Sequence, residues 1–330
     1  MGEYIGRINT TKDTMIFVVN NVFEKGIKES TTKENILKMM PEIYENADEE
    51  EIIKLLPYKS YKALEELIKY IKTENDIKKF FYESEYTGVK YLEEAMIIIM
   101  RVKHLEYNYS LNPGVIEKLT KIYTKESAKI AERYEKIERL TMGILYTYGV
   151  VDFDFLREQI CKCMNETITE EELEDLYFKR LNLNIDVDYY DIKWTNTNQT
   201  QSFVTYLNEE WDEIDVGDIA SEQKGRGLKY KIFKESELLK REEYLWNDDA
   251  QKLFEFMKST NDDIYQLTIE RIMKKSELGE NILNKLIEKC RFKDDNEVER
   301  FMQLYMKWYN NNPQYPLCGY SPNELVKMMK

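Results

Sequence analysis

The stretch from Leu140 to Leu207 constrains the fold most, because its hydrophobic period changes from helical to strand-like. Its first part is apolar at helical spacing, and we predict that this first helix ends at Gly149. Asp152 is a suitable N-cap for a second helix. Thr169, with Glu172 three residues later, has the form of a capping box and predicts the start of a third helix.

The second part of this stretch favours strands. Residues 185–189 alternate apolar and polar side chains, which is typical of a half-buried strand, and residues 203–207 are a second run with high β propensity. The polar residues 196–202 between them are suitable for the tip of a hairpin. Three short helices followed by a hairpin is the order of a winged helix, so we expect a winged-helix-like domain over residues 140–235.

A similar order precedes this domain. Residues 92–102 are apolar on most faces and predict a buried helix, and residues 104–111 alternate like a short strand. Residues 116–139 predict a long helix on which lysine and glutamate interleave, as on a solvated connector; a phosphate-facing stripe is the alternative. We therefore predict an N-terminal segment over residues 1–30, then a helical, degenerate winged-helix-like domain with a long connector helix over residues 31–139.

Glycine and proline are few for a chain of this length, with 12 Gly and 6 Pro in 330 residues. Both residue types interrupt helices, so long helices are the default expectation. Amphipathic segments dominate residues 236–330, for which we predict a C-terminal helical domain. Its last helix is predicted to begin at Ser321, with Pro322 at the first helical position and Glu324 at the third. The expected fold class is mainly α with small β hairpins, arranged as tandem winged-helix-like units plus the C-terminal helical domain.

The net charge of −14 and the isoelectric point of about 4.9 weigh against a protein that binds nucleic acid over its whole surface. The N-terminus lacks the apolar region of a signal peptide, and the longest apolar run, Ala95–Met100, is too short to span a bilayer. We therefore expect a cytoplasmic protein with no membrane partner and with reduced cysteines.

The sequence lacks the residues that several kinds of catalysis require. The one histidine, His104, lies in an apolar strand-like run, so a catalytic triad built on it is not expected. Cys161 and Cys163 lack the spacing of a zinc site, and Gly225-Arg226-Gly227 lacks a dinucleotide-binding context. We predict no catalytic, cofactor-binding or metal site and no enzymatic activity. A four-cysteine zinc site and a carboxylate-only nuclease site are the alternatives.

The charge changes sign sharply between two consecutive runs. Residues 207–222 contain acids and no base, and residues 223–234 contain bases and no acid. Alternation of Leu228, Tyr230 and Ile232 with lysines predicts a strand in the second run. This strand either pairs with the acidic run across a hairpin or offers its bases to nucleic acid; the bases are Lys224, Arg226, Lys229, Lys231 and Lys234.

The predicted third helix begins with Glu170, Glu171 and Glu172, which repel phosphate, so we do not expect it to read the major groove of DNA. The favoured function is a non-enzymatic regulatory or interaction protein that binds a protein partner, such as a basic nucleic-acid-binding protein. The acidic residues expected to face this partner are Glu209, Glu210, Asp212, Glu213 and Asp215. The alternative is a DNA-binding transcriptional regulator that uses the bases at 224–234. A phage or mobile-element protein that mimics nucleic-acid charge is a third hypothesis.

Two short motifs carry a resemblance to a protein family. They are Tyr148-Gly149-Val150-Val151 and residues 311–325, which read Asn-Asn-Pro-Gln-Tyr-Pro-Leu-Cys-Gly-Tyr-Ser-Pro-Asn-Glu-Leu. Together they resemble uncharacterised low-GC bacterial proteins related to those that carry a SEC-C-type metal-binding tail. The cysteine cluster of that tail is absent, with Cys318 alone in this region. The resemblance therefore implies a hint of fold and no functional site.

Overall fold

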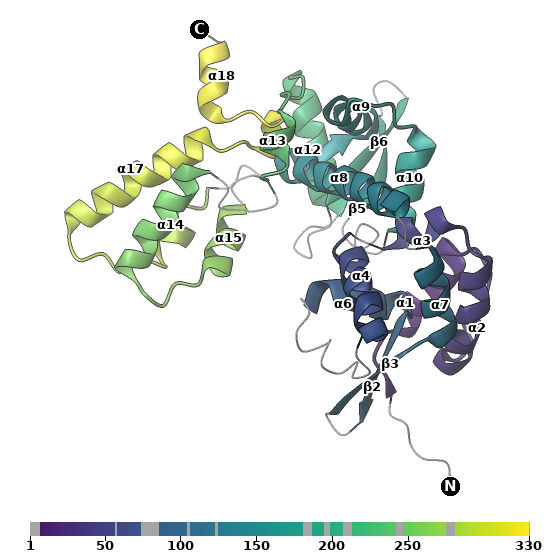
Figure 1. Ribbon diagram of the computed structural model, residues 1–330. Coiled ribbons are helices and arrows are strands. Elements are labelled where there is room, and N and C mark those ends of the chain that lie inside the picture. Colours follow the sequence, from purple (N-terminus) through teal and green to yellow (C-terminus); the bar gives the residue numbers. More distant parts are fainter. Residues whose placement is uncertain are drawn as a thin grey trace. The chain divides into compact units, whose positions relative to one another are not determined.

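The computed structural model (Figure 1) describes residues 7–56, 58–73, 86–103, 106–122, 125–180, 187–194, 199–206, 213–241, 247–274 and 281–329. These residues are mainly helical and their strands form two small sheets, so the expected mainly α fold class with small β elements is confirmed. None of the helices described is both long enough and apolar enough to cross a membrane. The chain divides into two compact units, residues 1–138 with 169–186 and residues 139–168 with 187–330.

The first unit combines a three-stranded sheet with most of the N-terminal helices. The strand order is β1-β2-β3, and both neighbouring pairs are antiparallel. Its elements are β1 (Arg7–Ile8), α1 (Lys12–Phe17), the π-helical η1 (Val18–Val22), α2 (Lys33–Asn46), α3 (Glu49–Leu55), α4 (Tyr58–Thr73), α6 (Tyr86–Glu94), β2 (Ile98–Lys103), β3 (Glu106–Leu111), α7 (Pro113–Ile122), the start of α8 (Lys125–Tyr148) and α10 (Glu170–Lys179).

The core of the first unit forms where helices present apolar stripes to one another. Ile36, Met40 and Tyr44 of α2 are spaced four residues apart, which places them on one face of the helix, and all three are buried. The Tyr44 hydroxyl donates a hydrogen bond to the Ala95 carbonyl at 2.9 Å. This bond satisfies the polar end of a side chain that is otherwise enclosed by apolar groups.

The buried helix predicted over residues 92–102 is wrong. α6 ends at Glu94, Met96 adopts a left-handed conformation with a φ of 58°, and β2 begins at Ile98. The isoleucines at 97–99 are β-branched, and such side chains pack well on a pleated sheet and lose rotamer freedom in a helix. Ile98 and Ile99 therefore belong to a strand, β2, which pairs with β3. The short strand predicted after it is confirmed as β3.

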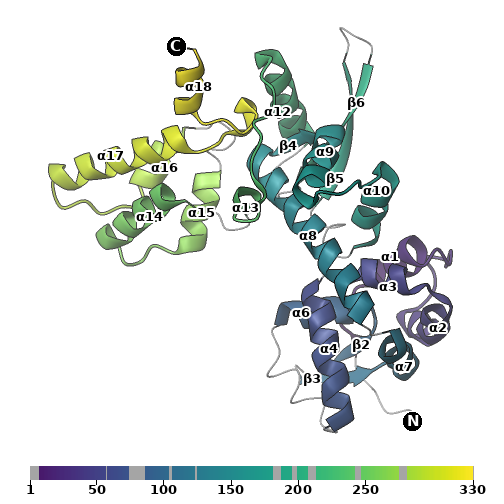
Figure 2. The ribbon, with the colours of Figure 1, turned by 45° about the horizontal axis from the view of Figure 1, so that its top comes forward.

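The second unit contains the other sheet and the C-terminal helices (Figure 2). Its sheet order is β4-β6-β5, again antiparallel. Its elements are the end of α8, β4 (Val150–Asp152), α9 (Phe153–Met164), β5 (Val187–Trp194), β6 (Gln199–Tyr206), α12 (Glu213–Arg226), α13 (Glu235–Leu238), α14 (Asp248–Thr260), α15 (Gln266–Lys274), α16 (Leu283–Ile287), α17 (Asp295–Asn311), the 3-10 helix η3 (Tyr315–Leu317) and α18 (Pro322–Met328).

The helix caps predicted from the sequence are confirmed. The Asp152 side chain accepts from the backbone N–H of Phe155 at 3.0 Å and begins α9, and Thr169 caps α10 in the same way through Glu172 N–H at 3.1 Å. Ser321 caps α18, with a complete capping box. These side chains accept hydrogen bonds from N–H groups in the first helical turn, which have no carbonyl partner within the helix. This explains why the helices begin where they do.

Two hydrophobic cores stabilise the second unit. In one, α12 covers the β4-β6-β5 sheet: Val216 and Ile219 of α12 pack against Val150 and Phe203 of the strands, together with Tyr315. The other lies among α14, α15, α16 and α17, with an aromatic series along α17 that runs through Phe301, Tyr305 and Trp308. The helical character predicted for the C-terminal residues is thus confirmed in the residues described.

Candidate interaction site around the C-terminal strap

The boundary between the two charge runs lies within a helix rather than at the turn of a hairpin. The end of the acidic run and the start of the basic run both belong to α12, with Glu213 and Asp215 in its first turn and Lys224 and Arg226 in its last. Amide groups at a helix N-terminus favour negative charge and carbonyl groups at its C-terminus favour positive charge. The expected hairpin pairing is therefore wrong, and the helix dipole accounts for part of the charge switch.

The strand predicted over residues 228–232 is also wrong. These residues form an extended segment that belongs to neither sheet of the described chain. The backbone N–H of Lys231 donates to the Cys318 carbonyl at 3.0 Å, and the Lys231 carbonyl accepts from the Tyr148 hydroxyl. The segment therefore finds its backbone partners in the C-terminal residues and in α8, which alternation of side chains does not reveal.

Residues 313–321, which we call the C-terminal strap, are buried along nearly their whole length. The fit is close at two glycines with positive φ. A Cβ atom on Gly149 (φ +69°) would lie 2.4 Å from the Tyr315 ring, and one on Gly319 (φ +81°) would lie 2.5 Å from the Tyr148 ring. The two sequence motifs that carry the family resemblance thus pack directly against each other.

Gln223 connects the strap to the sheet through side-chain hydrogen bonds. It was not predicted from the sequence. Its side chain is only 4% exposed. Its Nε2 lies 3.1 Å from the Tyr148 carbonyl oxygen, 3.1 Å from that of Val150 and 2.9 Å from that of Tyr315, and its Oε1 accepts from the Tyr230 hydroxyl at 3.1 Å. An uncharged glutamine at the boundary between an acidic and a basic run was the available signal.

The five predicted basic residues, which we call the basic surface, are placed by α12 and the extended segment that follows it. Lys224, Arg226, Lys229 and Lys234 have exposed side chains, and Lys231 is half-buried. Arg226 pairs with Glu222 one turn earlier at 2.7 Å. Both side chains of that pair are well exposed, so it is weak.

Two members of the basic surface, Lys224 and Lys231, lie next to Cys318. Lys224 and Cys318 line the same pocket of about 220 Å³, and Lys231 binds the Cys318 carbonyl through its backbone. Burial raises the pKa of the Cys318 thiol to about 11, although the positive charge of Arg226 lowers it slightly. This thiol is therefore protonated at neutral pH, which weighs against a role as a nucleophile.

The acidic residues predicted to face a partner are only partly described. Glu209, Glu210 and Asp212 lie outside the described residues, and the backbone of Glu213 and Asp215 begins α12. His104, the one histidine of the chain, also lies outside them. Within the part of the chain that the structure describes, no group of three or more His, Cys, Asp or Glu side chains is arranged to hold a metal ion.

α10, the third helix of the predicted winged-helix order, is bound by ion pairs within the first unit. The Asp175 carboxylate lies 2.7 Å from Lys54 Nζ and 2.8 Å from Lys179 Nζ. Glu172 pairs with Arg133 at 2.7 Å. The fully buried Arg180, which follows α10, pairs with Glu138. Glu172 and Asp175 thus connect this helix to α8 and α3.

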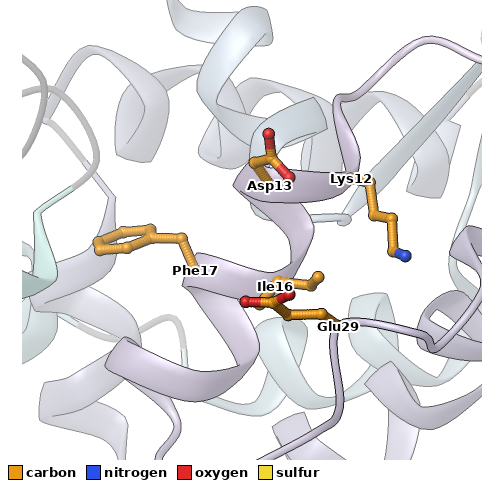
Figure 3. Close-up of a pocket in the computed structure, with 5 residues that line it drawn as sticks. All are labelled: Lys12, Asp13, Ile16, Phe17 and Glu29. Carbon is orange, nitrogen blue, oxygen red and sulfur yellow. The ribbon is translucent and has the colours of Figure 1, made fainter.

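A second pocket of about 390 Å³ lies beside α1 in the first unit (Figure 3). Its lining combines the ammonium group of Lys12, the carboxylates of Asp13 and Glu29, and the apolar side chains of Ile16 and Phe17. Figure 3 shows Lys12 and Phe17 at opposite sides of the view, so these groups do not converge on one point. The pocket therefore offers no arrangement that selects a particular ligand.

The basic surface and the strap are thus the best-defined candidate site. They are held together by Gln223, Cys318 and Glu324, none of which was among the site residues predicted from the sequence. No model of a protein family, no curated protein and no solved structure matches this chain.

Proposed function

We propose that this chain is a non-enzymatic interaction protein whose winged-helix region binds a basic protein partner. The succession of α8, β4, α9, α10, β5 and β6 along the chain, with the sheet order β4-β6-β5, supports the winged-helix part of this proposal. The observation that carries the proposal concerns α10, which in a winged helix of this order would be the DNA-reading helix. Its Glu172, Asp175 and Lys179 form ion pairs, and its first turn is acidic. Such a helix serves as scaffold and does not bind phosphate.

The partner is proposed to be basic because the chain carries a concentrated acidic run over residues 207–222. Opposite charges attract over long range and align two proteins before contact. The contact set we propose is Glu209, Glu210, Asp212, Glu213 and Asp215.

Calorimetric titration with an arginine- and lysine-rich peptide tests this function. Replacing the five contact acids by their amides is expected to weaken binding about fivefold or more, and salt between about 50 and about 200 mM is expected to weaken the wild type further. A control variant with the same loss of charge replaces five exposed, dispersed acids: Glu42, Glu66, Glu158, Asp262 and Glu288. Equal weakening by both variants, or absence of binding by the wild type, would contradict the proposal.

A second candidate function is DNA binding through the basic surface. Four of its five side chains are exposed, and Lys224 lines the pocket that contains Cys318, which favours this function. We expect the affinity for a short DNA duplex to fall steeply with salt, and the triple variant K224E/R226E/K229E to lose binding. No retention of the duplex by the wild type at low salt would remove this function and leave the first one untouched.

A further inference from the structure

One ion pair connects the basic surface to the C-terminal helix α18. Lys231 Nζ lies 2.6 Å from Glu324 Oε1 and 4.5 Å from the centre of the Phe233 ring. The other carboxylate oxygen, Glu324 Oε2, accepts from the backbone N–H of Ser321 at 2.9 Å and lies 3.2 Å from its hydroxyl. A single side chain thus closes the capping box of α18 and neutralises one lysine of the basic surface.

The backbone around this pair fixes where Lys231 can reach. Its N–H is bonded to Cys318 of the strap and its carbonyl to the Tyr148 hydroxyl. The side chain must therefore leave from a fixed point between the strap and α18. The side chains of Lys231 and Glu324 are 26% and 38% exposed, so water and other anions have access to the pair. Partly exposed pairs of this kind are weak enough to exchange partners.

We propose that Glu324 is an internal anionic ligand of the basic surface, and that a phosphate group of double-stranded DNA displaces it from Lys231. This inference rests on the second candidate function above. Phosphate and carboxylate compete for the same ammonium group, and the phosphate contact gains from the release of counterions bound to DNA. Binding of DNA and attachment of Lys231 to α18 are then mutually exclusive, so each weakens the other.

The variant Glu324→Gln removes the negative charge and keeps the helix cap. Glutamine also functions at the N3 position of a capping box, because its amide oxygen accepts the Ser321 N–H. The expected result is a gain in affinity of the full chain for a short DNA duplex of about threefold to tenfold at about 50 mM salt. The dependence of the affinity on salt is expected to steepen by up to about one counterion, because one more lysine is available.

Two control variants separate this effect from a general change in charge. Glu237→Gln removes a charge from the same N3 position of α13, where the Glu237 carboxylate accepts from the backbone N–H of Lys234 at 2.8 Å. It is expected to change the affinity by less than about twofold. In the Lys231→Gln background, Glu324→Gln is expected to have no effect, because the lysine that it liberates is gone.

The outcomes distinguish the two proposals. If the wild type fails to bind the duplex, or the variant K224E/R226E/K229E binds as well as the wild type, DNA binding by the basic surface is wrong. If DNA binding through the basic surface holds, the internal-ligand proposal is overturned alone by either of two results. One is an unchanged affinity for Glu324→Gln, and the other is a gain that persists in the Lys231→Gln background.

Discussion

Two glycines allow the strap to approach the end of α8, and each carries a conformation that other residues rarely adopt. Gly319→Ala would place a methyl group 2.5 Å from the Tyr148 ring at a φ of +81°. Left-handed backbone and overpacking each cost on the order of 1–3 kcal/mol, so we expect a loss of about 2–4 kcal/mol in the free energy of unfolding. Urea unfolding followed by circular dichroism measures it.

Gly225→Ala is the matched control for this substitution. Gly225 lies within α12, and a Cβ atom there would meet nothing within 4 Å. Since alanine has the higher helix propensity, we expect a gain of about 0.5–1 kcal/mol. If both glycine variants changed stability by the same amount, the strap contact at Tyr148 would be unimportant.

Gln223 is a second residue on which the strap depends. Gln223→Leu keeps the approximate volume and removes the donor that faces three buried carbonyl groups. An unsatisfied buried acceptor costs about 1–3 kcal/mol, so we expect a loss of about 2–4 kcal/mol on urea unfolding. Gln251→Leu is a suitable comparison because that exposed glutamine bonds only to Glu255 among the described residues, and we expect a change within about 0.5 kcal/mol. Similar losses for both variants would contradict the proposed role of Gln223.

At the scale of elements, α10 is held in the first unit by charge as well as by its apolar face. Burial opposes ionisation of Asp175, but hydrogen bonds from Lys179 and Lys54 outweigh it and lower the pKa of this carboxyl below its usual value. A lowered folded-state pKa stabilises the fold above the unfolded-state value of about 3.9, and this contribution is lost as the pH falls through the folded-state pKa.

We therefore expect Asp175→Asn to lower the free energy of unfolding by about 1–2 kcal/mol near pH 7, between the ranges for exposed and buried pairs. The difference from the wild type should shrink towards about pH 3 as the wild-type carboxyl becomes protonated. Urea unfolding over this pH range measures both. Glu174→Gln, on the neighbouring position of α10, is expected to change stability by less than about 0.5 kcal/mol. A difference for Asp175→Asn that is the same at every pH would refute the electrostatic origin.

The elements that could be predicted from sequence are those set by local chemistry. Asp152, Thr169 and Ser321 mark three helix starts correctly, because an N-cap needs only its own side chain and the next turn. The errors occur where the secondary structure depends on hydrogen bonds to segments distant in sequence. Residues 228–232 alternate like a strand, but the Lys231 N–H donates to the strap. Ile98 and Ile99 are apolar enough for a buried helix, but they pair with β3. The basic surface could be selected by its charge, whereas Gln223 and Glu324 act through contacts about 70 to 95 residues away in sequence.

At the scale of the whole molecule, the net charge of −14 opposes the compact state. Two effects of salt compete. Screening weakens repulsion between exposed acids, which stabilises the chain, and it weakens ion pairs such as Lys54–Asp175 and Arg180–Glu138, which destabilises it. Buried and partly buried pairs are screened much less than exposed charges, so relief of repulsion should dominate.

We therefore expect the melting temperature to rise by a few degrees as salt increases from about 0.01 to about 0.1 M, where the Debye length falls from about 30 to about 10 Å. The variant with five dispersed acids replaced by amides, at Glu42, Glu66, Glu158, Asp262 and Glu288, should respond less, because fewer charges repel one another. Differential scanning calorimetry of both proteins tests this. A melting temperature that falls with salt in the wild type would mean that the ion pairs around α10 outweigh the repulsion. In that case the first unit would depend on charge more than on its apolar core.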